Sequence, residues 1–150
     1  MRAVVQRVSE ASVRVGERTV ASIGQGLMVL VCVEVGDTGQ QAVRLVDKLL
    51  KLRIFADAQG RMNRSLQDLD GQGLQGELLL ISQFTLAADT DSGMRPSFTS
   101  AASPEKALAG FNALVEAVRR RHDPVATGRF GADMQVGLLN DGPVTFWLET

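Results

Sequence analysis

Ser82, Gln83 and Thr85 carry hydroxyl and amide groups and follow the apolar residues 78–81. Hydroxyl and amide groups can orient a polar substrate, but a hydroxyl needs a base to become a nucleophile. The single histidine, His122, follows three arginines where we expect a helix to end, so we interpret it as a cationic cap of that helix. A Ser-His-Asp or Cys-His mechanism therefore has no base. Catalysis would have to rely on positioning, backbone donors and hydroxyl groups, which suffices only for an activated substrate.

Residues 140–143, Asn-Asp-Gly-Pro, lie between two strand-like runs, residues 134–139 and 144–148. Asp and Asn bond their own backbone, Gly reaches φ values that other residues avoid, and Pro fixes φ while removing a donor. The cluster predicts a turn between two strands, with Pro143 next to the start of the second, where a proline is tolerated. It also leaves a Gly-Pro peptide bond, for which the trans and cis isomers are both open from the residues alone.

Other kinds of site have little support. A zinc site draws on several Cys and His ligands, and this chain has one of each. There is no Walker loop and no Gly-x-Gly-x-x-Gly after a strand, and we expect neither a cofactor nor a metal. Asp89 and Asp91 could bind a hard cation, but they lack the spaced ligands of a calcium site, so a solvated loop is the preferred interpretation. Cys32 stands in an apolar run, where we expect a buried, inert thiol.

The composition is that of an ordinary globular protein, with 45% hydrophobic and 22% charged residues in a chain of 150. We expect one domain over residues 1–150. No apolar run reaches the roughly 20 residues that a membrane helix needs, so we expect a cytoplasmic protein without a membrane partner. Of 16 basic residues 13 are Arg, which suits phosphate binding, although genome composition explains the bias as well. The net charge of −1 does not fit a general nucleic-acid binder, and we expect no DNA partner.

Most of the chain has patterns typical of β-strands. Residues 3–8 and 11–15 are short, β-branched and partly alternating, and a longer apolar run extends to residue 35. A short strand is expected at residues 53–55, and a fully apolar one at residues 78–81. Together with two helices, this order favours an α+β fold with a mixed or antiparallel sheet that closes towards a β-barrel.

Two main helices are expected to flank this sheet. The first begins after Thr38, which matches a capping box with Gln41. The second begins at Pro104, with Ser103 as its N-cap, and ends in residues 119–122. The apolar positions that we expect to be buried are Val43, Leu45, Val46, Leu49, Leu50 and Leu52 in the first helix, and Leu108, Phe111, Leu114, Val115 and Val118 in the second.

Six segments form an ordered set: Arg53-Ile54-Phe55, Gly60-Arg61-Met62-Asn63, Ser82-Gln83-Phe84-Thr85-Leu86, Arg95-Pro96-Ser97-Phe98, Thr127-Gly128-Arg129-Phe130 and Asn140-Asp141-Gly142-Pro143-Val144-Thr145. In this order, and in a chain of this length, they closely resemble the bacterial D-aminoacyl-tRNA deacylases, the D-Tyr-tRNA deacylase family. The resemblance runs from residues 6–8 to residues 146–148. The departures lie where variation is expected, at Met94 and in the loop of residues 67–76.

The resemblance implies a hydrolase that cleaves the ester bond of D-aminoacyl-tRNA and so performs chiral proofreading in translation. It also implies a homodimer, in which Gly142-Pro143 is a cis dipeptide inserted into the partner subunit's active site. Two neighbouring backbone carbonyls would then point the same way and contact the α-carbon and amino group of the substrate. An L side chain would clash with them, whereas many D side chains, and also glycyl-tRNA, would be accepted.

The same resemblance implies roles for further residues. Ser82, Gln83 and Phe84 would line the pocket for the terminal adenosine and the scissile ester, with backbone N–H groups forming an oxyanion hole. Met134 would be a wall of the adenine pocket, and Arg7 would anchor the Gly-Pro loop. From the residues alone, core packing explains Phe84 and Met134 as well, and an exposed strand position explains Arg7.

Thr85 is one candidate for the group that attacks the ester, and the residues alone leave this assignment open. Its hydroxyl could attack the ester, but no base is near it in the sequence. In a continuing strand Gln83 and Thr85 share one face, so Ser82 and Thr85 both meet the ester only if the strand bends. We prefer attack assisted by the ribose hydroxyl of the RNA, with protein side chains orienting the ester and a water molecule.

Alternatives remain for the partner and for the function. Arg119, Arg120 and Arg121 either contact phosphates of the tRNA acceptor stem or cap the preceding helix. The second function that fits the sequence is a non-catalytic dimeric RNA-binding barrel that holds aminoacyl ends, which the missing base would suit. A small-molecule esterase fits less well, because nothing supplies both a nucleophile and a base.

Overall fold

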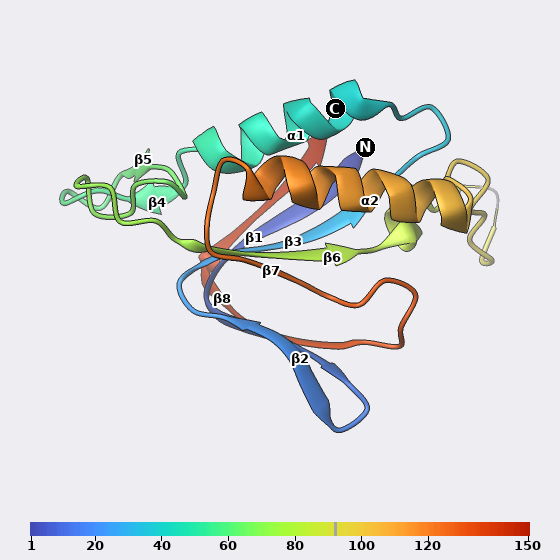
Figure 1. Cartoon of the computed structure of the whole chain (residues 1–150), viewed down its shortest axis with the longest axis horizontal. Helices are drawn as coiled ribbons and strands as arrows, with labels where there is room; N and C mark the ends of the chain where they lie inside the picture. Colours follow the sequence, from blue (N-terminus) through green and yellow to red (C-terminus); the bar gives the residue numbers. More distant parts are fainter. Residues whose placement is uncertain (92) are drawn as a thin grey trace.

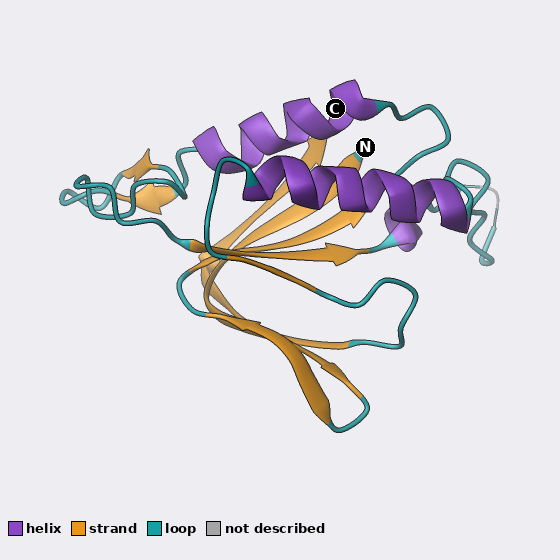
Figure 2. Cartoon of the chain, in the orientation of Figure 1, coloured by secondary structure: helices purple, strands orange, loops and turns teal. Residues whose placement is uncertain are grey.

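The structure is a computed structural model that describes residues 1–91 and 93–150, in which one curved sheet carries two long helices on one face (Figures 1 and 2). A small second sheet extends from one end. The large sheet contains β1 (Arg2–Val15), β2 (Arg18–Ile23), β3 (Gly26–Cys32), β6 (Glu77–Ser82), β7 (Val125–Thr127) and β8 (Gln135–Glu149), and the small one β4 (Phe55–Ala56) and β5 (Met62–Arg64). The helices are α1 (Gly39–Lys51) and α2 (Pro104–Arg119), with a 3₁₀ turn, η1 (Phe84–Ala87).

The large sheet is mixed, as the sequence predicts. β1 pairs antiparallel with β2, β3 and β8, whereas β6 pairs parallel with β3 and β7 pairs parallel with β6. Figure 1 shows β2 and one end of β8 curling away from the helices, so that the sheet approaches a barrel. No pairing joins β7 to β8 or β2 within residues 1–91 and 93–150, and the barrel stays open. The expected α+β class with two flanking helices is confirmed.

Both faces of the sheet are buried at β6. Leu78 and Leu80 of β6 face the helices and belong to the larger core cluster. Leu79 and Ile81 point the other way, into a smaller cluster inside the curl of the sheet. The period of two along a strand explains this division, and burial on both faces explains why residues 78–81 are continuously apolar.

The helix starts agree with the sequence. The Thr38 hydroxyl accepts a hydrogen bond from the backbone N–H of Gln40 at 3.3 Å, and the Gln41 side chain accepts one from the N–H of Thr38 at 2.9 Å. Ser103 accepts from the N–H of Lys106 at 3.4 Å ahead of α2. Two expectations on buried positions are wrong, since Val43 is 54% and Leu108 40% exposed. Val43 lies off the stripe that packs on the sheet, and Leu108 lies in the helix half that borders the open pocket described below.

β1 and β8 are each continuous where the sequence predicts two strands. Residues 140–143 do not reverse the chain, because both halves of β8 pair with β1 (Gln6↔Thr145 and Val8↔Asn140). Arg7 alone therefore lies opposite residues 141–144, which bulge out of the ladder. The predicted turn is wrong, and the Asn140 side chain shows why: it donates to the carbonyls of Arg7 at 2.9 Å and Val144 at 3.0 Å and closes the base of the bulge. The Gly142-Pro143 peptide bond is cis.

His122 is not a cationic cap. It lies beyond the end of α2, is buried, and its Nε2 is 2.8 Å from the carbonyl oxygen of Gly76. Burial lowers the pKa of His122 below its usual value, and the hydrogen bond to Gly76 and the charge of Asp123 oppose this shift only in part. Burial therefore favours the neutral imidazole in the folded chain, which corrects the sequence-based interpretation.

We expect the protein to lose stability below pH 6.5, the ordinary pKa of a histidine. The unfolded chain binds more protons there than the folded chain with its buried imidazole, so falling pH favours unfolding, by at most about 1.4 kcal/mol at pH 5.5. Urea unfolding at pH 7.5 and 5.5 measures the loss. His122→Gln, which keeps a donor for Gly76 and does not titrate, should show a smaller loss; an equal loss in both proteins would contradict the assignment.

Candidate active site

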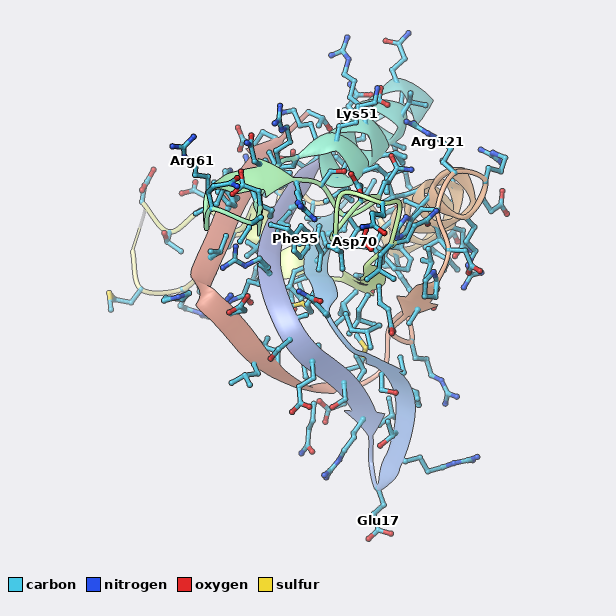
Figure 3. The ribbon with its side chains drawn as sticks, turned by 90° about the vertical axis from the view of Figure 1, so that its left-hand side faces the viewer. Glu17, Lys51, Phe55, Arg61, Asp70 and Arg121 are labelled. Carbon is cyan, nitrogen blue, oxygen red and sulfur yellow. The ribbon has the colours of Figure 1, made fainter. Side chains whose placement is uncertain are left out.

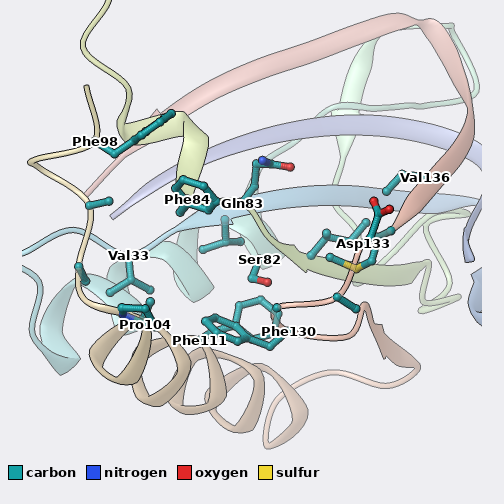
Figure 4. Close-up of a pocket in the computed structure, with 18 residues that line it drawn as sticks. Val33, Ser82, Gln83, Phe84, Phe98, Pro104, Phe111, Phe130, Asp133 and Val136 are labelled. Carbon is teal, nitrogen blue, oxygen red and sulfur yellow. The ribbon is translucent and has the colours of Figure 1, made fainter. Parts of the chain in front are cut away.

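A pocket of about 570 Å³ opens between the end of β6 with η1, the first half of α2 and the loop between β7 and β8 (Figure 4). Its volume is in the range of small-molecule sites. Aromatic rings make up much of its wall, and few polar side chains face it. The aromatic residues are Phe84, Phe98, Phe111 and Phe130, and the polar ones are Ser82, Gln83 and Asp133.

Four residues expected at a common site do line this pocket: Ser82, Gln83, Phe84 and Met134. Thr85 adjoins it, because the Gln83 side chain donates a hydrogen bond of 2.5 Å from Nε2 to the Thr85 hydroxyl. β6 ends at Ser82 and the chain turns at once into η1, so the bend that Ser82 and Thr85 require is present. The structure thus brings Ser82, Gln83 and Phe84 into the lining of the pocket, and Thr85 lies beside the pocket, bonded to Gln83.

The 3₁₀ turn η1 is fixed by side chains from three other parts of the chain. Each of them donates to a backbone carbonyl of the turn, so the positions of Phe84 and Thr85 do not depend on local sequence alone. The donors are Cys32 Sγ to Phe84 at 3.6 Å, Arg2 to Leu86 at 3.2 Å and Ser100 Oγ to Ala87 at 2.8 Å.

Cys32 lies beneath this turn and has no accessible surface. Burial first, and the nearby Glu34 second, raise the pKa of its thiol. The predicted burial of Cys32 is confirmed, and its Sγ supports the turn at Phe84.

Phe84 is a surface residue of the site. Its side chain is 56% exposed, and its ring meets that of Phe98 edge to face, with centroids 5.1 Å apart. Core packing, the alternative left open by the sequence, is thereby excluded for Phe84. An exposed aromatic pair at a pocket mouth offers a face to a flat ligand.

Met134 depends on a glycine across the pocket wall. A Cβ atom built at Gly128 would lie 2.8 Å from the Met134 sulfur, which is too close for any other residue unless the methionine moves. Met134 also packs against the core cluster inside the curl of the sheet. Because Gly128 has no side chain, Met134 has room to pack against the core cluster and to line the pocket.

Arg7, Gly142 and Pro143 lie outside this pocket. Arg7 donates to the backbone carbonyl of Asp141 at 3.3 Å, forms a 3.1 Å ion pair with its carboxylate, and donates to the carbonyl of Ile54 at 2.6 Å. It thus ties the bulge of β8 to the chain beside β4. Within one chain, the expected catalytic segment and the Gly-Pro segment do not form one site.

The arginines at the end of α2 are also remote from the pocket, which borders the first half of that helix. Arg121, labelled in Figure 3, donates to Asp47 of α1 at 2.7 Å, and Lys51 pairs with the same carboxylate at 3.3 Å. These partners hold the pKa of Asp47 below its usual value. Arg119, Arg120 and Arg121 are all exposed, and Arg121 has a structural partner in Asp47.

Asp133, Phe98 and Phe130 line the pocket although sequence reasoning did not single them out for function. Phe98 and Phe130 lie in segments that the family resemblance includes, which is the signal that could have found them. Asp133 precedes Met134 directly. Within residues 1–91 and 93–150, no group of three or more His, Cys, Asp and Glu side chains could hold a metal ion, and no helix is long and apolar enough to cross a membrane.

The family model described as D-Tyr-tRNA(Tyr) deacylase matches residues 4–149. The chain belongs to this family. A D-aminoacyl-tRNA deacylase of Burkholderia lata is 58% identical over 149 residues, covering 99% of this chain and 98% of the relative. A protein of the same name from Burkholderia mallei is 59% identical over 150 residues, covering 100% and 99%. The resemblance found in the sequence, and with it the assignment to hydrolases of aminoacyl-tRNA esters, is confirmed.

Two solved structures share the fold of this deacylase family member. One, named c-Myc DNA Unwinding Element Binding Protein, aligns with a TM-score of 0.91 and 40% identity over 100% of this chain and 99% of that chain. The other, described as a structural analysis of a probable eukaryotic D-amino acid tRNA deacylase, aligns with a TM-score of 0.80 over 99% and 98%. At 18% identity, the second likeness concerns the fold alone.

Proposed function

We propose that this protein hydrolyses the ester bond of D-aminoacyl-tRNA and releases the free D-amino acid and tRNA. The observation that carries the proposal is the pocket in which Ser82, Gln83 and Phe84 gather, with Thr85 bonded to Gln83, in a chain of the deacylase family. The pocket takes the terminal adenosine with its ester, and the rest of the tRNA stays outside. One catalytic domain spans residues 1–150, and it acts in the cytoplasm, where aminoacyl-tRNA is used.

The ribose hydroxyl of the RNA assists the attack on the ester. The Thr85 hydroxyl accepts a hydrogen bond from the amide of Gln83, which holds it in place without removing its proton. An amide is not a base, so Thr85 is oriented but not activated as a nucleophile. Ser82, Gln83 and Thr85 orient the ester and an attacking water, and backbone N–H groups at the start of η1 stabilise the oxyanion.

Thr85→Ala should therefore retain measurable turnover. We expect a fall in kcat of about 10-fold, because an orienting hydrogen bond is lost and no bond-forming atom is removed. Single-turnover hydrolysis of D-aminoacyl-tRNA, with tRNA binding measured in parallel, gives the value. Retained binding without detectable turnover would assign the attack to the Thr85 hydroxyl.

Chiral selection comes from a homodimer in which the Gly142-Pro143 segment of one subunit enters the pocket of the other. Both residues are exposed and stand in the bulge of β8, outside the pocket of their own chain. Leu139, Phe146 and Trp147 of the same strand are between 36% and 60% exposed, which provides apolar surface for a second copy. Backbone carbonyls of the segment exclude an L side chain and accept a D residue or glycine, so glycyl-tRNA is cleaved as well.

Hydrolysis of matched D- and L-aminoacyl-tRNA tests the proposal. Rapid release of the D-amino acid with the L-ester spared supports it. If a folded dimeric protein binds both and cleaves neither, the protein is the second candidate, a dimeric RNA-binding barrel that holds aminoacyl ends. DNA added as a competitor at equal concentration should not reduce the rate, in keeping with the net charge of −1.

A further inference from the structure

Asp133 is the one formally charged side chain among the described residues that line the pocket. It is exposed, and Figure 4 places it on the wall across from Gln83. No hydrogen bond or ion pair within residues 1–91 and 93–150 engages its carboxylate. A carboxylate without a protein partner at the wall of an aromatic pocket is open to a donor on the ligand.

The turn before Asp133 fixes this position. The N–H of Ala132 donates to the carbonyl of Arg129 at 3.2 Å, and Gly131, with φ +72°, occupies the third position of the turn, where a type II turn requires a positive φ. The same turn directs Phe130 to the pocket, where its ring lies 6.4 Å from that of Phe111. An aromatic ring, a carboxylate and a thioether, from Phe130, Asp133 and Met134, thus come from one short segment.

This combination suits a purine with an exocyclic amine. Aromatic and thioether groups contact the faces of a base, and a carboxylate accepts a hydrogen bond from an amine on its edge. The described lining residues include no cation, so a phosphate group has no counter-charge there. We propose that Asp133 accepts a hydrogen bond from the 6-amino group of the 3′-terminal adenine and selects for that base. This role of Asp133 rests on the function proposed above.

The α-ammonium group of the substrate is the competing donor. It lies next to the ester, which the proposed function places at the Ser82–Thr85 segment, on the other side of the pocket from Asp133. Phe130 and Met134, which suit a base, belong instead to the segment of Asp133. The Asp133 carboxylate is therefore placed to accept from the adenine amine and not from the α-ammonium group.

Two tRNAs that differ at one group test the proposal: D-aminoacyl-tRNA ending in adenosine, and the same tRNA ending in purine riboside, which has a hydrogen in place of the 6-amino group. Wild type should prefer adenosine by about 10- to 100-fold in kcat/KM, mainly through KM. Asp133→Ala should lower kcat/KM for the adenosine form to that for the purine riboside form. Glu17→Ala, the same loss of charge at the far β1–β2 turn labelled in Figure 3, is the control and should change neither value.

The possible failures are distinguishable. If wild type cleaves both tRNAs with equal kcat/KM, the role of Asp133 in base selection is overturned while the deacylase function stands. A loss of equal size on both tRNAs in Asp133→Ala would assign the carboxylate to the α-ammonium group or to the structure of the pocket, and would also overturn it. If wild type cleaves neither, the proposed function itself fails.

Discussion

Gly142→Ala should reduce the hydrolysis of D-aminoacyl-tRNA at least about 100-fold while the protein remains folded. Gly142 has φ +125°, a value that residues with a side chain rarely adopt. An added Cβ would lie 2.7 Å from Cγ2 of the buried Val144 and 3.1 Å from the guanidinium of Arg7. The bulge must therefore shift, and a displacement of about 1 Å in a group that positions the substrate costs roughly this factor.

Gly137→Ala is the matched control for this variant. It adds the same methyl group to the same strand, but its Cβ would only touch the Ser12 hydroxyl at 3.5 Å, an ordinary contact. Rates for D- and L-aminoacyl-tRNA should be measured for both variants beside urea unfolding curves. If Gly142→Ala kept full activity towards the D-ester and still spared the L-ester, the segment would have no part in substrate selection.

Gly26→Ala should strongly destabilise the fold. A Cβ at Gly26 would lie 1.8 Å from the backbone carbonyl oxygen of Glu77, its partner in the parallel pairing of β3 and β6. The atoms that clash are held by the backbones of two paired strands, and these cannot move aside as the end of a side chain can. The first residue pairs of the β3–β6 ladder must therefore separate. We expect a loss of more than about 4 kcal/mol, a large part of the 5–15 kcal/mol that stabilises an ordinary domain.

Soluble yield and denaturant unfolding measure this effect, with Gly24→Ala as the control. A Cβ at Gly24 would lie 3.4 Å from Glu77 Oε1, the end of a flexible side chain, and should cost little. A Gly26→Ala protein with the unfolding midpoint of the wild type would show that β3 and β6 are not paired in this register.

The helix starts and the apolar strand at residues 78–81 could be predicted because their signals are local. A capping residue, such as Thr38 or Ser103, bonds to groups within three positions of itself. The continuity of β8 could not be predicted in this way. Asn140 bonds to the carbonyl of Arg7, a residue 133 positions away, and this contact turns an apparent turn into a bulge of one strand.

The same distinction applies to the pocket. The segment from Ser82 to Thr85 could be singled out because it belongs to a family motif. Asp133 was missed, since a single carboxylate in a loop has no local signature. His122 was misinterpreted because the preceding arginines suggest a cap, whereas burial against Gly76 depends on how the loop before β6 packs.

The separation of the pocket from the Gly142-Pro143 segment within each chain has a genetic consequence. In the proposed homodimer, each active site takes its pocket from one polypeptide and its chiral filter from the other. A chain with a disabled pocket and a chain with a disabled filter, expressed together, would assemble a mixed dimer with one intact site and one doubly defective site. Two inactive alleles of this gene should therefore complement each other, which two alleles with the same defect cannot do.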